Sequence, residues 1–194
     1  MRISGGLARG ISLVVPKGDA VRPATDGMRQ AVFSSLVARV PGARFLDLFA
    51  GSGGYGLEAF SRGAAGGLFV EQSHKALGCL RRNIESVGRS MKADTRALRV
   101  TAGDAVQAPW PDTAPPDLVF IDPPYEQIAD LAPRLFARLG EVLAAHPDPV
   151  IVFEMPGEIT LTPPGWTAVK RLGKGAHQPT AVFFRRTTSL PAAP

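Results

Sequence analysis

Short apolar runs alternate with longer amphipathic segments along most of this chain. From residue 44 onward, seven runs rich in branched and aromatic residues have the character of β-strands, at 44–50, 67–72, 98–104, 117–125, 149–156, 166–172 and 180–186. Three segments between them place apolar residues at helical spacing, at 54–63, 74–88 and 131–145. This alternation predicts an α/β fold built on a doubly wound, mostly parallel sheet, with the last two runs forming a closing pair of strands.

The first 40 residues follow a different pattern. Residues 2–16, RISGGLARGISLVVP, predict a hairpin, and residues 25–40 predict a helix that opens at Thr25 or Asp26. We therefore divide the chain into an N-terminal hairpin and helix extension at 1–40, a main domain at 41–187 and a disordered tail at 188–194. The extension is rich in basic residues.

Composition narrows the classes of partner and compartment. The 194 residues suit one domain, and a net charge of +5 with a pI near 9.9 makes an anionic partner such as nucleic acid plausible. The single cysteine, Cys79, excludes an internal disulfide and any multi-cysteine zinc site, and no metal is expected. No apolar run approaches the ~20 residues of a membrane span, and the N-terminus lacks a signal-peptide pattern, so we predict a cytoplasmic protein.

The stretch FLDLFAGSGGYGLEA, residues 45–59, has the form of a nucleotide-binding loop. Gly51, Gly53 and Gly56 fit G-x-G-x-x-G, and Glu71 follows about 20 residues later, where a ribose-binding acid is expected. Taken alone, this fingerprint suits an NAD-dependent dehydrogenase as well as an enzyme with another adenosine cofactor.

Acidic residues come at the carboxyl ends of four successive strands, where parallel sheets bind their ligands. They are Asp47, Glu71, Asp104 and Asp122. A carboxylate at Asp47 would repel a pyrophosphate, but it suits S-adenosyl-L-methionine, which has no phosphate and carries an ammonium and a sulfonium. Glu71 can accept from ribose hydroxyls, and Asp104 is placed to face the adenine amino group. The loop therefore favours S-adenosyl-L-methionine over NAD.

The fourth strand leads into Asp122, Pro123, Pro124 and Tyr125, the most specific motif in the chain. The two prolines fix the backbone and remove two N–H donors, which leaves carbonyl acceptors. The Asp122 side chain and the Pro123 carbonyl can hold the hydrogens of an exocyclic amino group, so that its lone pair points at a methyl donor. Tyr125 can stack on the base. This motif predicts methyl transfer to an amino group.

With these motifs the chain resembles the bacterial 16S ribosomal RNA guanine-N2 methyltransferases of the RsmD family. The resemblance runs from the first residue to Tyr125, through MRISGGLARGISLVVP, RPATDGMRQAVFSSL, LDLFAGSGGYGLEAFSRGA, FVEQ, NIESVG and DLVFIDPPY. It implies a Rossmann-like class I fold whose seven-stranded sheet has a reversed last strand and helices on both faces. It also implies a monomer that methylates the N2 of one guanine in the helix-31 loop of 16S rRNA, within the assembling or assembled 30S subunit.

The resemblance assigns roles to particular positions. The catalytic loop is Asp122, Pro123, Pro124 and Tyr125. The cofactor contacts are Asp47, Ala50, Gly51, Gly53, Glu71, Gln72, Gly103, Asp104, Ala105 and Asp122. The candidate RNA contacts are Arg2, Arg9, Arg22, Thr25, Arg29, Lys174 and His177. Tyr55 stands where the family usually has a small residue, and from this position we expect it to narrow the mouth of the cofactor site.

Four other functions stay open on the sequence. A DNA adenine-N6 methyltransferase and a protein glutamine methyltransferase share the fold. The first usually needs a further segment for duplex bases, and the second usually has Asn at the position of Asp122. An RNA-binding module that kept the fold without catalysis and an NAD-dependent dehydrogenase are the remaining alternatives.

Overall fold

The structure, a computed structural model, describes residues 1–16, 26–110, 114–173, 175–176 and 178–187. Its helices are α1 (Asp26–Ser35), α2 (Gly54–Ser61), α3 (His74–Met91), a short 3-10 helix η1 (Tyr125–Gln127) and α4 (Ile128–Val142). Its strands are β1 (Arg44–Leu48), β2 (Gly66–Glu71), β3 (Leu98–Ala102), β4 (Leu118–Ile121), β5 (Val150–Pro156), β6 (Trp166–Leu172) and β7 (Pro179–Arg186). The predicted tail, 188–194, lies outside the described residues.

The strands form one sheet of seven, in the order β3-β2-β1-β4-β5-β7-β6. Strands β1 to β5 run parallel, and β7 is antiparallel to both β5 and β6. The chain reverses its winding direction between β1 and β4, which places the ligand-binding crevice of such a sheet at their carboxyl ends. This architecture confirms the predicted Rossmann-like fold and its reversed last strand.

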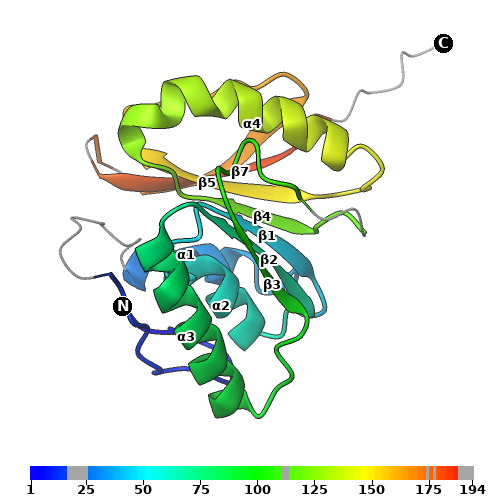
Figure 1. Ribbon diagram of the computed structural model, residues 1–194. Helices are drawn as coiled ribbons and strands as arrows, with labels where there is room; N and C mark the ends of the chain where they lie inside the picture. Colours follow the sequence, from blue (N-terminus) through cyan, green and yellow to red (C-terminus); the bar gives the residue numbers. More distant parts are fainter. Residues whose placement is uncertain (17–25, 111–113, 174, 177, 188–194) are drawn as a thin grey trace.

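Helices cover both faces of the sheet (Figure 1): α1, α2 and α3 lie on one side and α4 on the other. Alternate residues of each strand feed the two cores. Phe45, Phe69 and Phe120 point to the face of α1 to α3. Leu46 and Ile121 point to the face of α4. Helix α4 buries its apolar side around Leu135, Phe136 and Leu139, as its helical spacing predicts.

The N-terminal segment folds against α2 as part of the first core. A single antiparallel bridge joins Arg2 to Ser12, with Ile3 donating to the Ile11 carbonyl at 2.9 Å, so the predicted hairpin is a loop with one bridge rather than two regular strands. Ile3 and Leu13 are buried in the core. Helix α1 begins at Asp26, as expected, and ends at Ser35, five residues before the predicted end. The division of the chain at residue 40 stays a prediction.

A buried ionic network holds this segment in place. The guanidinium of Arg29 is fully buried and contacts the Glu58 carboxylate at 3.4 Å, the Asp26 carboxylate at 2.8 Å and the Arg2 carbonyl. Glu58, also fully buried, accepts from Ser4 Oγ at 2.7 Å and pairs with Arg62 at 2.8 Å. Helices α1 and α2 and the N-terminal loop therefore share one set of paired charges.

Removing Arg29 should cost far more stability than removing a surface arginine. For Arg29→Met we expect the free energy of unfolding to fall by about 3 kcal/mol, because a buried carboxylate loses a partner. Urea-induced unfolding measures this change. The control is Arg96→Met, since Arg96 is 92% exposed in its pair with Asp94, and it should leave the midpoint unchanged. Equal midpoints for the two variants would show that the buried network does not stabilise the fold.

Candidate active site at the carboxyl ends of the parallel strands

The glycine-rich loop follows β1 through a sequence of unusual backbone conformations. Phe49, Gly51 and Gly53 all have positive φ, of 62°, 55° and 91°. A bulky side chain such as that of Phe49 rarely adopts this conformation, and its strain marks the loop as a functional segment. A side chain added at Gly51 would meet no atom within 4 Å, so open space lies above the loop at this position.

The third glycine of the fingerprint lets α2 approach the sheet closely. A Cβ at Gly56 would overlap the Phe69 ring and would lie 2.6 Å from the Phe45 ring. Its backbone N–H, in the first turn of α2, donates to Asp47 Oδ2 at 2.8 Å. Helix α2 is therefore fixed to β1 by a close contact and by a hydrogen bond at its N-terminus.

Asp47 lies beneath the loop rather than at its surface. Asp47 is only 2% exposed, and one of its carboxylate oxygens accepts the hydrogen bond from the Gly56 N–H. Asp47 therefore supports the loop backbone through this hydrogen bond, and its contact with the cofactor stays a prediction. Burial raises the pKa of Asp47 from 3.8 to about 7, and the neighbouring charge of Glu71 acts in the same direction.

Glu71 ends β2 and reaches across to the glycine loop. Its carboxylate accepts from the N–H of Gly51 and from the N–H of Ser73, both at 2.7 Å. Ala50 donates to the Val70 carbonyl at 3.0 Å, which ties the loop to the end of β2. These bonds bring the predicted contacts Ala50, Gly51 and Glu71 together, with the exposed Gln72 beside them. An acceptor at this edge suits a ligand with vicinal hydroxyl groups.

The loop after β3 is held by an arginine side chain of α4, the helix on the other face of the sheet from α1 to α3. Asp104 caps the turn by accepting from Val106 at 2.8 Å, and Gly103 donates to the Glu71 carbonyl at 2.9 Å. Arg138 of α4 stacks on Trp110, 3.8 Å from the ring centre, and donates to two carbonyls of this loop. Ala105, expected to contact the cofactor, is buried with its side chain in the core on the α4 side. Sequence reasoning did not find Arg138, which has no local motif.

The four-residue motif after β4 forms the centre of this edge. Asp122 is partly exposed, Pro123 is buried, Pro124 is exposed, and Tyr125 starts η1 and packs in part against the α4 core. Pro124 is extended, with φ −55° and ψ 130°, and its carbonyl accepts from Gln127 at 3.0 Å. Although Asp122 is partly exposed, the protein atoms around its carboxyl group desolvate it and raise its pKa well above 3.8, and the charges of Glu154 and Asp47 raise it further.

A second pair of residues, which sequence reasoning did not assign, lies beside Asp122. Glu154 of β5 is 3% exposed, and its Oε2 accepts from the Tyr55 hydroxyl at 2.7 Å. The Tyr55 ring is buried and stacks on Phe120, with ring centres 5.2 Å apart. Tyr55 therefore packs under the sheet edge and does not narrow the cofactor mouth, contrary to expectation. An acid within the apolar run VIVFEMP was the signal that could have pointed to Glu154.

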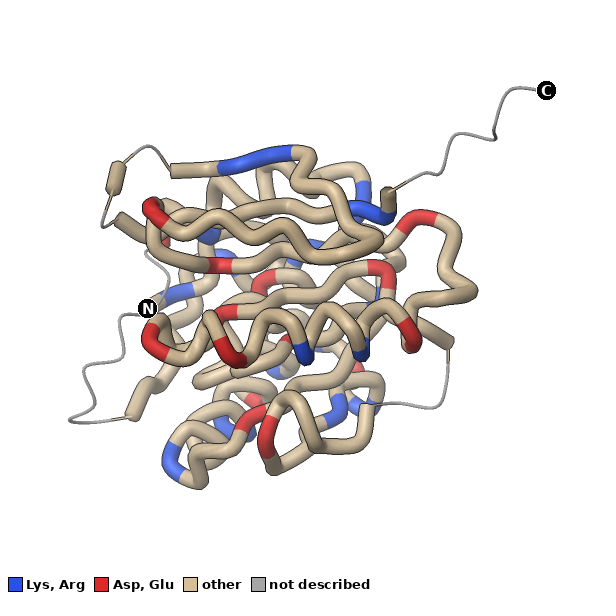
Figure 2. The backbone as a smooth tube through the Cα atoms, turned by 90° about the horizontal axis from the view of Figure 1, so that it is seen from above, with Lys and Arg blue, Asp and Glu red and all other residues tan. Residues whose placement is uncertain are grey.

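The predicted RNA contacts divide into three groups. Arg2 and Arg9 are exposed, and the Arg2 side chain is 71% accessible. The prediction that Arg29 contacts RNA directly is wrong, because its side chain is fully buried and forms ion pairs with Asp26 and Glu58. Arg22, Thr25, Lys174 and His177 lie outside the described residues. Basic and acidic residues are interspersed along the described chain, rather than gathered on one face (Figure 2).

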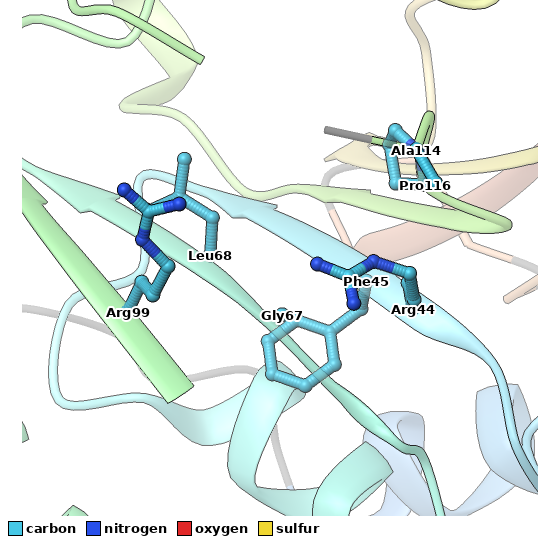
Figure 3. A pocket seen from close by; sticks show the side chains of 7 residues that line it. All are labelled: Arg44, Phe45, Gly67, Leu68, Arg99, Ala114 and Pro116. Carbon is cyan, nitrogen blue, oxygen red and sulfur yellow. The ribbon is translucent and has the colours of Figure 1, made fainter. Parts of the chain in front are cut away.

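A small cavity lies at the amino ends of the strands, away from the candidate site (Figure 3). Its walls come from the amino ends of β1, β2 and β3 and from the segment before β4, with Arg44 and Arg99 among the lining residues. Because ligands of open α/β sheets bind at the carboxyl ends, this cavity is separate from the candidate site. Among the described residues no cluster of His, Cys, Asp and Glu could hold a metal ion. None of the described helices is long and apolar enough to span a membrane.

The residues at the carboxyl ends of the parallel strands fit S-adenosyl-L-methionine. Glu71 offers a carboxylate at the end of β2, Asp104 lies at the end of β3, and open space lies above Gly51. The order of the strands and the motif after β4 complete the description of a Rossmann-like, S-adenosyl-L-methionine-dependent methyltransferase, which is the class of this protein. The similarity to known methyltransferases, given next, confirms the predicted cofactor.

Comparison with known proteins narrows the class to a family. Residues 1–182 match the family described as Conserved hypothetical protein 95, the RsmD family, and the chain belongs to it. It is 37% identical to Ribosomal RNA small subunit methyltransferase D of Escherichia coli K12 over 127 residues, 66% of this chain and 61% of that protein's length. It is 30% identical to the Haemophilus influenzae protein of the same name over 176 residues, 90% of this chain and 89% of the other.

A solved structure agrees with the fold along nearly the whole chain. A hypothetical protein of Thermus thermophilus superposes with a TM-score of 0.70 at 30% identity, and covers 95% of this chain and 98% of its own. The resemblance first noted from residue 1 to Tyr125 therefore extends through the C-terminal strands.

The buried carboxyl group of Asp47 should make stability fall with rising pH. Its pKa is raised on folding, so the stability that it contributes is fully present below pH 3.8 and is lost as pH rises through about 7. A pKa difference of this size corresponds to about 4 kcal/mol. In Asp47→Asn, the decline in the free energy of unfolding between pH 4 and 7 should therefore be shallower, as measured by urea denaturation at a series of pH values.

The matched control for this pH series is Asp94→Asn. The Asp94 side chain is 55% exposed, so this variant should keep the wild-type slope in the same window. A slope in Asp47→Asn equal to that of the wild type would show that Asp47 is already ionised near pH 4 in the folded protein.

Proposed function

We propose that this protein transfers a methyl group from S-adenosyl-L-methionine to the exocyclic N2 of a guanine in 16S rRNA, in the helix-31 loop. The observation that carries the proposal is the placement of Asp122 to Tyr125 at the switch point, beside the glycine loop. The names of the Escherichia coli and Haemophilus influenzae relatives support ribosomal RNA of the small subunit as the substrate. The 30S subunit, assembling or assembled, is then the partner, in the cytoplasm, and a monomer suffices.

The bound cofactor supplies an activated methyl group: the amino nitrogen's lone pair forms the new N–C bond, and the electrons of the broken C–S bond stay on sulfur. Glu71 would hold the ribose hydroxyls, and the loop from Gly103 to Ala105 would flank the adenine. Helix α2 and Asp47 fix the glycine loop from below. Each of these residues therefore orients the methyl donor without taking part in bond exchange.

The motif residues act on the base. The Asp122 carboxylate and the Pro123 carbonyl accept the two amino hydrogens, so the nitrogen lone pair is directed at the methyl group. One of these protons leaves the nitrogen when the N–C bond forms, and the Asp122 carboxylate is the acceptor nearest to it. Tyr125 stacks on the guanine, which must be splayed from its loop to enter the site.

A transfer assay tests the reaction and the substrate together. Tritiated S-adenosyl-L-methionine is incubated with 30S subunits from a strain that lacks the gene, with free 16S rRNA and duplex DNA in parallel. Label on the subunits that digests to N2-methylguanosine is the expected result. Label on DNA alone would favour the adenine-N6 alternative, and bound cofactor with no transfer to any of the three would overturn the proposed substrate.

Two substitutions in the motif should separate binding from catalysis. Asp122→Asn keeps the shape but loses the proton acceptor, so kcat should fall about 100-fold or more while the Kd for S-adenosyl-L-methionine changes little. Tyr125→Ala should raise the KM for RNA roughly 10- to 100-fold through lost stacking. Tyr125→Phe keeps the stacking face and is the control. Full activity in Asp122→Asn would contradict the role given to Asp122.

A further inference from the structure

The strongest unassigned feature is the pair of carboxyl groups formed by Asp122 and Glu154. Strands β4 and β5 are parallel, and Ile121 pairs with Phe153 at the end of their ladder, so Asp122 and Glu154 are the next residues in register. Phe120 and Val152, two residues earlier, both point to the face of α1 to α3. Alternation along a strand therefore directs Asp122 and Glu154 to that same face.

Glu154 is held from the helix side by a group that orients it. The Tyr55 hydroxyl donates to Glu154 Oε2 at 2.7 Å, and the ring is clamped between α1 and the sheet by Phe33 and Phe120. Burial raises the pKa of Glu154, whereas the Tyr55 hydrogen bond and the positive charge of Arg29 on α1 oppose this shift and favour the ionised form. On the neighbouring β7 the residue opposite Glu154 is Ala181, which offers no charge.

Placing the partly exposed Asp122 beside the buried Glu154 on adjacent strands is costly, and packing alone does not require it. An isolated charge in a protein interior is strongly destabilising, whereas Gln and Phe would fill the same spaces as Glu154 and Tyr55 without that cost. Pairs of like charges that shift a pKa are found most often at functional sites, where the proton affinity of a group matters to the reaction. Asp47 on β1 is the other acid that acts on Asp122.

We propose that Glu154, oriented by Tyr55, is a positioning residue whose negative charge strengthens Asp122 as the proton acceptor in methyl transfer. The cationic cofactor beside Asp122 weakens that carboxylate as a base, and Glu154 offsets this effect from the opposite side. The proton that leaves the methylated nitrogen passes to Asp122, with the charge of Glu154 stabilising the protonated acid. This inference rests on the proposed reaction at an amino group but not on which RNA carries it.

The first test needs no RNA substrate. In the cofactor-free protein, infrared spectroscopy follows the carbonyl stretch of protonated carboxyl groups across a pH series, and Asp122→Asn identifies the band of Asp122. In Glu154→Gln that band should disappear at lower pH than in the wild type, since the neighbouring negative charge is gone. An Asp122 band that titrates at the same pH in both proteins would overturn the proposal.

The second test uses the reaction itself. In Glu154→Gln, kcat should fall about 10- to 100-fold with the Kd for S-adenosyl-L-methionine unchanged, and the acid limb of the pH–rate profile should move to lower pH. Tyr55→Phe, which removes only the hydroxyl that orients Glu154, should lower kcat by a smaller factor. A loss of kcat with an unmoved acid limb would assign these residues a structural role and overturn the proposal.

Thr180→Val is the matched control for the loss of a buried hydrogen bond. Thr180 is 1% exposed and donates to the carbonyl of Met155, next to Glu154, at 2.9 Å. It should leave both the infrared titration and the pH profile of kcat as in the wild type. A shifted infrared titration in Glu154→Gln without methyl transfer to any RNA would support the coupling of the two acids and reject the proposed substrate.

Discussion

The close approach of α2 to the sheet is the constraint on which the site depends. Because Gly56 has no side chain, α2 lies directly against the rings of Phe45 and Phe69, and its first turn comes within hydrogen-bonding distance of Asp47. That contact sets where β1 ends and where the glycine loop must turn. The positive φ values at Phe49, Gly51 and Gly53 are the backbone consequence of joining a strand to a helix over so short a distance. The ribose-binding edge, formed by Gly51 and Glu71, follows from the same turn.

The N-terminal segment completes this support from the outer side. Glu58 lies on α2, and its carboxylate binds Arg29 of α1, Ser4 of the N-terminal segment and Arg62 at the C-terminal end of α2. Helix α2 is therefore fixed at its start by Asp47 and along its length by Glu58. A residue such as Arg29, which on sequence grounds suited an RNA contact, instead joins α1 to the helix that carries the cofactor loop. The N-terminal segment thus acts on the site through α2.

The sequence predicted the elements whose signals are local and missed those set by distant partners. The strands, the glycine loop and the motif at Asp122 have recognisable spacing, and the structure has them where expected. Arg29 was misassigned because an arginine on a polar helix ordinarily faces solvent, and its burial depends on Glu58, which is 29 positions away. Glu154 has no motif around it. Its role depends on its hydrogen bond with Tyr55, 99 positions away, and on its position beside Asp122, which follows the neighbouring strand.

The row of acids at the carboxyl ends explains why these distant partners are needed. Glu71, Asp47, Asp122 and Glu154 come from four neighbouring strands and place four carboxyl groups at one end of the sheet, where all but Asp122 are buried and where their ionised forms repel one another. A cationic ligand relieves that repulsion, whereas a pyrophosphate would add to it, so the same charges that favour a sulfonium cofactor disfavour a dinucleotide. Without the ligand, the Gly51 and Gly56 amides, the Tyr55 hydroxyl and the Arg29 charge stabilise the row. Groups on the helices packed beneath the acids therefore offset the repulsion between them. The stability of this face of the fold and the preference for a cationic cofactor thus depend on the same carboxyl groups.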